Sequence, residues 1–370
     1  MNKYVGISPI LQYADKHPII SFLKENEKEL IFYGAGAFCD EMLKQAEEYA
    51  LPVRFIVDRD PNKRGASMRG GIEVKCIDDI AEEIYKYKIM ICINVVFSAI
   101  STLKEYGVDE KDIYFPRERI CHINGFVKGF NRYHDYLSPI DMHVNKAHYL
   151  KAYELLEDDN SKAIFRTLCW YRLTGEIIDK HLLNDDLSYF NNSYAVPSKN
   201  ECFVDVGAYN GDTIMEFMAK TNYNYKSIIA IEPSSKQCMR MEDLFKNYEN
   251  IEIINCGVGE EEAELYLDGM QMNHNAGEKC FIHTLDTILE EKDVSIIKMD
   301  IDGMERKALN GAHRIIRERA PMLAVCIYHL TTDIWYLIEM LHQMQPKYHF
   351  VLEQPITTAL SETVLYAYSC

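Results

Sequence analysis

The segment Cys202–Phe217 reads CFVDVGAYNGDTIMEF and constrains the fold more than any other part of the chain. An apolar run reaches Asp205, glycines follow at positions 207 and 211, and a helix-like pattern begins after them. A strand, a glycine turn and a helix in this order are typical of a parallel α/β sheet that binds a nucleotide-like ligand at the turn. The sequence therefore predicts such a sheet, and the chemistry of the turn must indicate the ligand.

Strands and helices alternate along two long parts of the chain, which favours parallel sheets covered on both faces. In the first part, the pattern predicts a loop over residues 59–71 and a helix over 77–86. The second part starts at Glu201 and has five strand candidates separated by helices. Two more, YHFVLEQ and TVLYAYS, follow with too few residues between them for a crossover helix, so an antiparallel hairpin should end the sheet.

We predict an α/β fold class with two Rossmann-like domains. The chain of 370 residues is long for one hydrophobic core, which agrees with two domains. The predicted parts are a helical lead-in at 1–30, a Rossmann-like nucleotide or nucleotide-sugar binding-like domain at 31–120, a helical connector at 121–198 and a second Rossmann-like domain at 199–370.

The acid beside the second glycine turn discriminates between ligands. Asp205 stands two residues before Gly207, where a carboxylate would repel the pyrophosphate of a dinucleotide. It would attract S-adenosylmethionine, which carries an ammonium and a sulfonium and has no phosphate. The alternative is that Asp205 only caps the following helix. Glu232 ends the next strand candidate and could bind both ribose hydroxyls, but a nicotinamide dinucleotide would use such an acid as well.

Composition argues against several classes of partner. The formal net charge of −17 disfavours nucleic acid, because it would repel a phosphate backbone. The 11 cysteines are scattered without a Cys-x-x-Cys pair, which favours buried thiols in a reducing compartment over a disulfide scaffold or a zinc site. No apolar run is long enough for a membrane span. We expect a cytoplasmic protein.

The second half of the sequence resembles the FkbM-type S-adenosylmethionine-dependent methyltransferases. The resemblance rests on FVDVGAYNGDTI, IEP, HTLDTIL, IIKMDIDGMERKALNGA, PMLAVCIYH and ETVLYA, which together span about residues 199–370. It implies a class I methyltransferase domain with a seven-stranded sheet, and O-methylation of hydroxyls on sugars, glycolipids or macrolides. It also implies that the glycine turn contacts the methionine part of the cofactor, Glu232 the ribose, and the end of the third strand the adenine. The turn residues are Asp205, Gly207, Ala208, Asn210 and Gly211, and those at the end of the third strand are Asn255, Cys256 and Gly257.

Three carboxylates follow the fourth strand candidate, at the sheet edge where α/β proteins bind ligands. Asp300 is expected to face the transferred methyl group, with Asp302 and Glu305 nearby. The family pattern usually has glutamate where Asp302 stands. The alternative for these acids is a capping or strand-end carboxylate. Sequence spacing completes no metal-ligand set around them, so we predict no metal.

His329 ends the fifth strand candidate and is the general base that we favour. Its unperturbed pKa of about 6.5 would let it accept a hydroxyl proton near neutral pH. The alternative is a histidine satisfied by hydrogen bonds at a strand end. His274 is a further candidate for lining an acceptor lid, and His283 precedes HTLDTIL.

The other glycine turn, FYGAGAFCDE, contains Gly34 and Gly36 and lacks an acid before its first glycine. It could accept a phosphate, with Asp58 at the end of VRFIVD on a ribose. This domain resembles Rossmann-like N-terminal domains of sugar-modifying enzymes, which implies a nucleotide-sugar site. A scaffold without a ligand is the alternative.

These features predict an S-adenosyl-L-methionine-dependent O-methyltransferase. Its acceptor would be a sugar, a glycan or a secondary metabolite, including a nucleotide sugar, and its specificity should reside in the connector and the 267–280 loop. The alternatives are a non-catalytic nucleotide-sugar-binding or scaffold protein of glycan biosynthesis and, through Gly34, a nicotinamide oxidoreductase. A homo-oligomer stays open.

Overall fold

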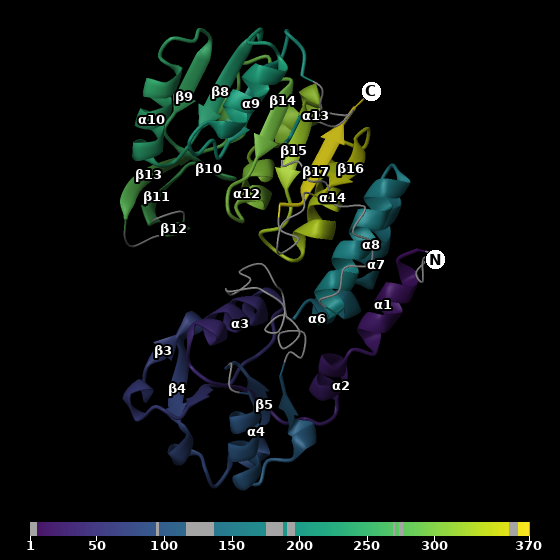
Figure 1. Cartoon of the computed structure of the whole chain (residues 1–370), viewed down its shortest axis with the longest axis vertical. Coiled ribbons are helices and arrows are strands. Elements are labelled where there is room, and N and C mark those ends of the chain that lie inside the picture. Colours follow the sequence, from purple (N-terminus) through teal and green to yellow (C-terminus); the bar gives the residue numbers. More distant parts are fainter. Residues whose placement is uncertain are drawn as a thin grey trace. The chain divides into compact units, whose positions relative to one another are not determined.

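The computed structural model describes residues 6–93, 96–115, 137–174, 188–190, 197–268, 271–273, 277–354 and 362–369. The chain divides into two compact units (Figure 1). Unit 1 contains Met1–Leu150 and Arg166–Ile178, and unit 2 contains Lys151–Phe165 and Asp179–Cys370. No helix within these described ranges is long and apolar enough to cross a membrane.

Unit 1 is built on a six-stranded sheet with the order β3-β4-β2-β1-β5-β6. All neighbours are parallel except β3 and β4, which are antiparallel. The strands are β1 (Leu30–Tyr33), β2 (Ile56–Asp58), β3 (Ser67–Met68), β4 (Ile72–Cys76), β5 (Lys88–Ile91) and β6 (Ile113–Tyr114), and the helices of this unit include α1 (Ser8–Asp15), α2 (Pro18–Lys24), α3 (Ala37–Glu48), α4 (Val96–Glu105) and α6 (Ser138–Val144).

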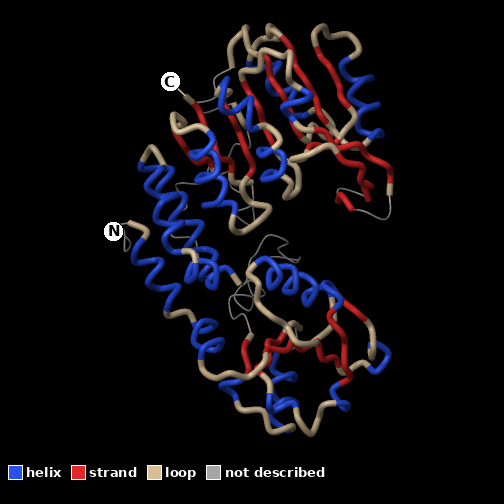
Figure 2. The backbone as a smooth tube through the Cα atoms, turned by 180° about the vertical axis from the view of Figure 1, so that it is seen from behind, coloured by secondary structure: helices blue, strands red, loops and turns tan. Residues whose placement is uncertain are grey.

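Helices cover both faces of this sheet. Successive side chains of a strand point to opposite faces, so β1 contributes to two cores. Phe32 packs with side chains of α2 and α3, whereas Ile31 and Tyr33 pack with side chains of α4. The helices in Figure 2 accordingly flank the strands of this unit on two sides. The predicted parallel sheet with two covered faces is present.

Two local predictions for unit 1 were wrong. The predicted loop over 59–71 contains β3, and the strand β4 that follows it was missed; β4 pairs in parallel with β2. The predicted helix over 77–86 is instead two short 3-10 turns, Ile77–Asp79 and Ile84–Lys86. Its three isoleucines, Ile77, Ile80 and Ile84, are nevertheless buried. Single turns bury isoleucines spaced three and four apart as well as a helix does, so spacing alone could not decide.

Unit 2 is built on a seven-stranded sheet with the order β16-β17-β15-β14-β7-β8-β9. The strands are β7 (Cys202–Val206), β8 (Ser227–Ile231), β9 (Ile251–Ile254), β14 (Ile296–Met299), β15 (Met322–Cys326), β16 (His349–Glu353) and β17 (Val364–Tyr368). The helices are α9 (Asp212–Lys220), α10 (Ser235–Phe245), α11 (Leu285–Ile288), α12 (Glu305–Asn310), α13 (His313–Arg319) and α14 (Asp333–Met344). The division between the units falls within α7 (Lys146–Leu155) and α8 (Asp159–Thr174).

The predicted seven-stranded sheet with a terminal antiparallel hairpin is confirmed. β16 and β17 are antiparallel, and all other neighbours up to β15 are parallel. The pattern did not predict that β17 also pairs with β15, antiparallel, and thus lies inside the sheet. The buried residues of β17 explain this position, since an apolar strand is best covered by two neighbours. The predicted connector lies partly outside the described residues, and its described part contains α6, α7 and α8.

A second, four-stranded sheet in unit 2 was not predicted. Its order is β10-β13-β11-β12, with β10 (Gly257–Val258), β11 (Ala263–Asp268), β12 (Gln271–Asn273) and β13 (Glu278–His283). Alternation in β13 buries Cys280 and Ile282 and exposes Phe281 between them. Part of the predicted 267–280 loop is therefore strand.

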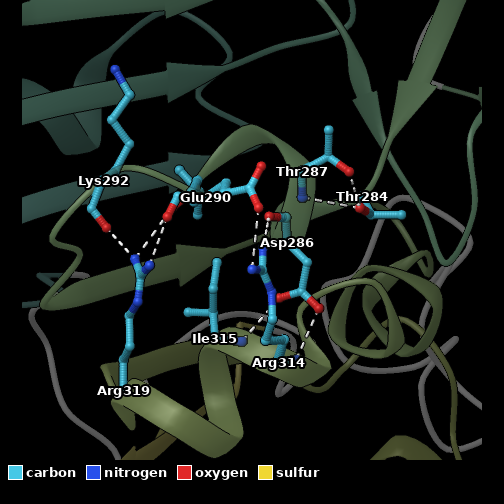
Figure 3. A network of polar contacts seen from close by, with 9 residues as sticks. Thr284, Asp286, Thr287, Glu290, Lys292, Arg314, Ile315 and Arg319 are labelled. Atoms are coloured by element: carbon cyan, nitrogen blue, oxygen red, sulfur yellow. Dashed lines mark hydrogen bonds and ion pairs between the residues drawn. The ribbon is translucent and has the colours of Figure 1, made fainter.

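The HTLDTIL motif fastens α11 to α13. Thr284 caps α11 by accepting the backbone N–H of Thr287. Asp286 accepts the N–H groups of Arg314 (2.8 Å) and Ile315 (2.9 Å), two of the donors that the first turn of a helix leaves without a partner. Figure 3 shows Arg319 at the other end of α13, where its guanidinium donates to the backbone oxygens of Glu290 and Lys292. This motif has a structural role.

Candidate functional site

The glycine turn after β7 requires glycine at two positions for packing. Gly207 has φ +80°, and a Cβ there would lie 2.0 Å from the backbone oxygen of Asp300. Gly211 has φ +82°, and a Cβ there would lie 2.7 Å from the ring of Phe245 on α10. Any side chain at either position would meet atoms already in place. The turn consequently lies directly against the C-terminal end of β14.

Asp205 is buried and paired with a lysine that sequence analysis missed. Lys298 on β14 is its direct neighbour in the parallel register, and Lys298 Nζ lies 3.0 Å from Asp205 Oδ1. The ammonium also donates to the backbone oxygen of Gly207 at 3.2 Å. The signal was present in SIIKMD, because a lysine within an apolar strand needs an acidic partner. The predicted attraction of Asp205 for a cationic ligand is therefore partly offset by the chain's own ammonium.

Burial and pairing shift both groups of this pair. Burial raises the pKa of Asp205 to about 6, and Lys298 opposes that shift. Burial lowers the pKa of Lys298, but the carboxylates of Asp205 and Asp300 outweigh it, so the net pKa is raised. The second oxygen of Asp205 has no hydrogen-bond partner among the described residues.

Glu232 holds the turn through the backbone. Its Oε2 accepts the N–H of Tyr209 in the turn, and its Oε1 accepts the N–H of Ser234, both at 2.9 Å. Burial raises the pKa of this carboxyl, against the opposing effect of the two N–H donors. This acid therefore has a structural role in the turn. The ribose contact stays a prediction.

The residues predicted to lie near an adenine follow the end of β9, and two residues predicted for the methionine part follow β7. Asn255 donates from its amide to the backbone oxygens of Glu232 and Pro233, each at 3.0 Å. Cys256 is buried, and burial raises its thiol pKa to about 12. Gly257 begins β10. Ala208 is buried, and Asn210 accepts the N–H of Asp212. These residues lie in the turns that follow β7 and β9 and at the start of β10.

The four residues predicted for the acceptor side come together. His329 Nε2 lies 3.4 Å from Asp300 Oδ1 and 3.6 Å from Asp302 Oδ1, while His329 Nδ1 lies 2.9 Å from Glu305 Oε1. The Glu305 side chain is fully buried, the His329 side chain is 6% exposed, and those of Asp300 and Asp302 are 27% and 43% exposed. The cluster thus has a buried half and a half open to solvent.

Further contacts fix this acid–imidazole cluster (Asp300, Asp302, Glu305 and His329). Glu305 Oε1 accepts the N–H of Ile301 at 3.0 Å. Tyr328, which sequence analysis also missed, donates its hydroxyl to Asp300 Oδ1 at 3.2 Å. Burial lowers the pKa of His329, but the carboxylates, first that of Glu305, raise it by more, so the net pKa is above its ordinary value. These charges favour an imidazolium over a neutral imidazole.

The remaining predicted residues lie elsewhere. His283, at the end of β13, contacts the carboxylate of Glu262, and His274 falls outside the described residues. In unit 1, the N–H of Ala35, between Gly34 and Gly36, donates to Asp58 at 2.7 Å. Lys63 Nζ lies 2.9 Å from the same carboxylate.

The family comparison agrees with the motifs. Residues 282–353, which contain the whole acid–imidazole cluster, match the family described as the methyltransferase FkbM domain. The resemblance inferred from the sequence is confirmed. Among curated proteins, none matches the chain significantly.

One solved structure supports the fold of the whole chain. Methyltransferase FkbM from Methylobacillus flagellatus KT is 22% identical, with a TM-score of 0.61 and 98% of each chain covered. An rRNA methylase from Streptococcus thermophilus (18% identity, 47% of this chain and 90% of that chain, TM-score 0.32) and a precorrin-6y C5,15-methyltransferase from Geobacter metallireducens GS-15 (10%, 47% and 82%, 0.32) are more distant. The first similarity extends over both units.

Proposed function

We propose that this methyltransferase uses S-adenosyl-L-methionine to methylate a hydroxyl group of a sugar, a glycan or a secondary metabolite. One observation supports this above the others: the backbone oxygen of Asp300 packs against Gly207. A cofactor bound at the glycine turn would therefore adjoin the acid–imidazole cluster, which would bind the acceptor.

The reaction suits these neighbours. The acceptor oxygen attacks the methyl carbon, the bond from carbon to sulfur breaks, and S-adenosylhomocysteine leaves as the uncharged product. The hydroxyl proton must go to a base, which the cluster supplies. His329, which the sequence predicted as the general base, would take it, through Nε2 on the side of Asp300 and Asp302. The positive charge of the approaching sulfonium would lower the pKa of a nearby imidazolium, so that more of His329 would be in the neutral form that can accept the proton.

Calorimetry tests the cofactor. We expect wild-type protein to bind S-adenosylmethionine and S-adenosylhomocysteine, and Asp205→Asn to weaken binding of the former by about tenfold, a loss of about 1.4 kcal/mol. Glu252→Gln is the matched control, because this exposed carboxylate on β9 pairs with Lys292 away from the turn. No binding by the wild type would exclude the proposal.

Unit 1 supports a second candidate, binding of a nucleotide or nucleotide sugar at its own turn. The observation is at Gly36, the N-cap residue directly before α3, which has φ −127° and where a Cβ would meet no atom within 4 Å. Packing does not require glycine there, whereas close approach of a phosphate to the helix N-terminus would. A thermal shift of the full chain with nucleotide sugars, lost in Gly36→Val, is the expected result. A flat response would favour a ligand-free scaffold.

A further inference from the structure

We propose that Asp300, Glu305 and His329 bind a divalent cation. One carboxylate oxygen from each acid and one imidazole nitrogen lie within 4.8 Å of one another. Asp300 directly follows β14, His329 lies three residues after β15, and Glu305 is the first residue of α12. The sequence could not supply this set, because His329 joins the acids only through the parallel pairing of β14 with β15.

Buried atoms without partners point to a ligand at this place. Within the described residues, neither Glu305 Oε2 nor His329 Nδ1 has a hydrogen-bond partner, and both side chains are more than nine-tenths buried. Nδ1 lies 2.9 Å from Glu305 Oε1. Nδ1 and Oε1 are therefore close but not aligned for a hydrogen bond. The other oxygen of Glu305, Oε2, is buried without a partner among the described residues, which costs free energy.

The charges also favour a cation. Three carboxylates surround a single imidazole, and the Lys298 ammonium, which acts on Asp300, is itself paired with Asp205. Neighbouring ligands of an octahedral ion at about 2.1 Å lie about 3.0 Å apart. The separation of 2.9 Å between His329 Nδ1 and Glu305 Oε1 is close to that, and the ligand set that includes an oxygen of Asp300 spans at most 4.8 Å. Carboxylates with an imidazole suit Mn²⁺, Mg²⁺, Fe²⁺ or Zn²⁺.

The cation gives the site a different way to activate an acceptor, and this part rests on the proposed function. A hydroxyl bound to the ion becomes more acidic, so its oxygen attacks the methyl carbon as an alkoxide while the bond to sulfur breaks. With one imidazole nitrogen on the ion, the proton passes to the exposed carboxylate of Asp302 and then to water. The cation would also fix the hydroxyl beside the glycine turn.

Manganese binding by the full chain, stripped of metal with a chelator, tests the inference without any turnover. We expect the electron paramagnetic resonance signal of free Mn²⁺ to fall with one saturable site. Asp300→Asn and His329→Ala should each weaken this site by about tenfold or more. Asp293→Asn is the matched control, because Asp293 precedes β14, at the opposite end of the strand from Asp300, and is exposed. It should bind Mn²⁺ as the wild type does.

Two outcomes would overturn the inference: no saturable binding by the wild type, or unchanged binding by both folded variants. If a variant does not fold, wild-type protein labelled with ¹⁵N-histidine answers the same question, because Mn²⁺ must broaden the imidazole signals of His329 before those of the other histidines. Calorimetry with S-adenosylmethionine in the presence of chelator separates the two proposals. Cofactor binding without Mn²⁺ binding refutes only the cation site, and the reverse refutes only the proposed function.

Discussion

The glycine turns of the two units are held in the same way but carry charge differently. In each, the acid that ends the second strand accepts a backbone N–H of the turn: Asp58 from Ala35 in unit 1, Glu232 from Tyr209 in unit 2. Among the residues that the structure describes, unit 2 alone adds a buried ion pair, Asp205 with Lys298, next to the turn. An acid after the second strand is thus explained by the turn itself, and the buried pair is the feature that sets unit 2 apart.

The largest expected effect comes from removing one half of that pair. Lys298→Met should destabilise unit 2 by about 3–5 kcal/mol, because it leaves the Asp205 carboxylate buried without a partner. The double variant Asp205→Asn/Lys298→Met should recover most of the loss. Urea unfolding followed by tryptophan fluorescence measures both changes, because Trp170 belongs to unit 1 and Trp335 to unit 2. If both variants are made in a protein that carries Trp170→Phe, the fluorescence reports on unit 2 alone.

Lys279→Met is the control for this prediction. Lys279 pairs with Glu264 at 2.8 Å, but both side chains are about half exposed, so its loss should cost less than about 1 kcal/mol. Equal losses in Lys298→Met and Lys279→Met would show that burial of the pair has no special effect, and the contrast between the two turns would fail.

A series of alanine substitutions gives the next largest effects. Gly207→Ala should cost about 3 kcal/mol, because a Cβ meets the backbone oxygen of Asp300 at 2.0 Å and φ is positive. Gly34→Ala should cost less, since its Cβ meets the Ile93 side chain, which can move. Gly36→Ala should lie within about 0.5 kcal/mol of the wild type. Unfolding curves rank the three, with Gly207→Ala in the Trp170→Phe parent and the two unit 1 variants in a Trp335→Phe parent, which reports on unit 1. Any other order would contradict the packing described.

The smallest effect distinguishes the two turn-holding acids by pH. Burial would raise the pKa of Asp58, but N–H donors and Lys63 outweigh it and lower it below 3.8, whereas burial raises that of Glu232 above 4.5. The contribution of Asp58 to stability is present above pH 3.8 and is lost as pH falls through its folded pKa. That of Glu232 is present below pH 4.5 and is lost as pH rises through its folded pKa.

Acidification from pH 6 to 3 should therefore weaken unit 1 and favour unit 2 through these groups. Asp58→Asn should reduce the pH dependence of the stability of unit 1, and Glu232→Gln that of unit 2. The measurement is the difference in urea midpoint between each variant and its single-tryptophan parent at each pH. If the two substitutions changed the pH dependence of their units in the same direction, the opposite pKa shifts of Asp58 and Glu232 would be contradicted.

Local patterns predicted most of the sheets and the two turns, and failed where a contact depends on register. The turn glycines, the order of strands and helices in unit 2 and the acids after β14 are all encoded in short segments. The pairing of Lys298 with Asp205 and of His329 with Glu305 depends on which strands become neighbours, so no short segment contains it. The strand β4 was missed because IEVKC mixes charged and apolar residues and follows a glycine-rich stretch.

The position of β17 has a consequence for synthesis. This strand is the last of the described strands to leave the ribosome, yet it lies between β15 and β16. Until it arrives, the apolar strand MLAVC of β15 has one edge with unpaired backbone groups, a surface to which other chains can add. A nascent chain stalled before residue 364 should therefore depend on chaperones, and the release of the finished chain should end that dependence.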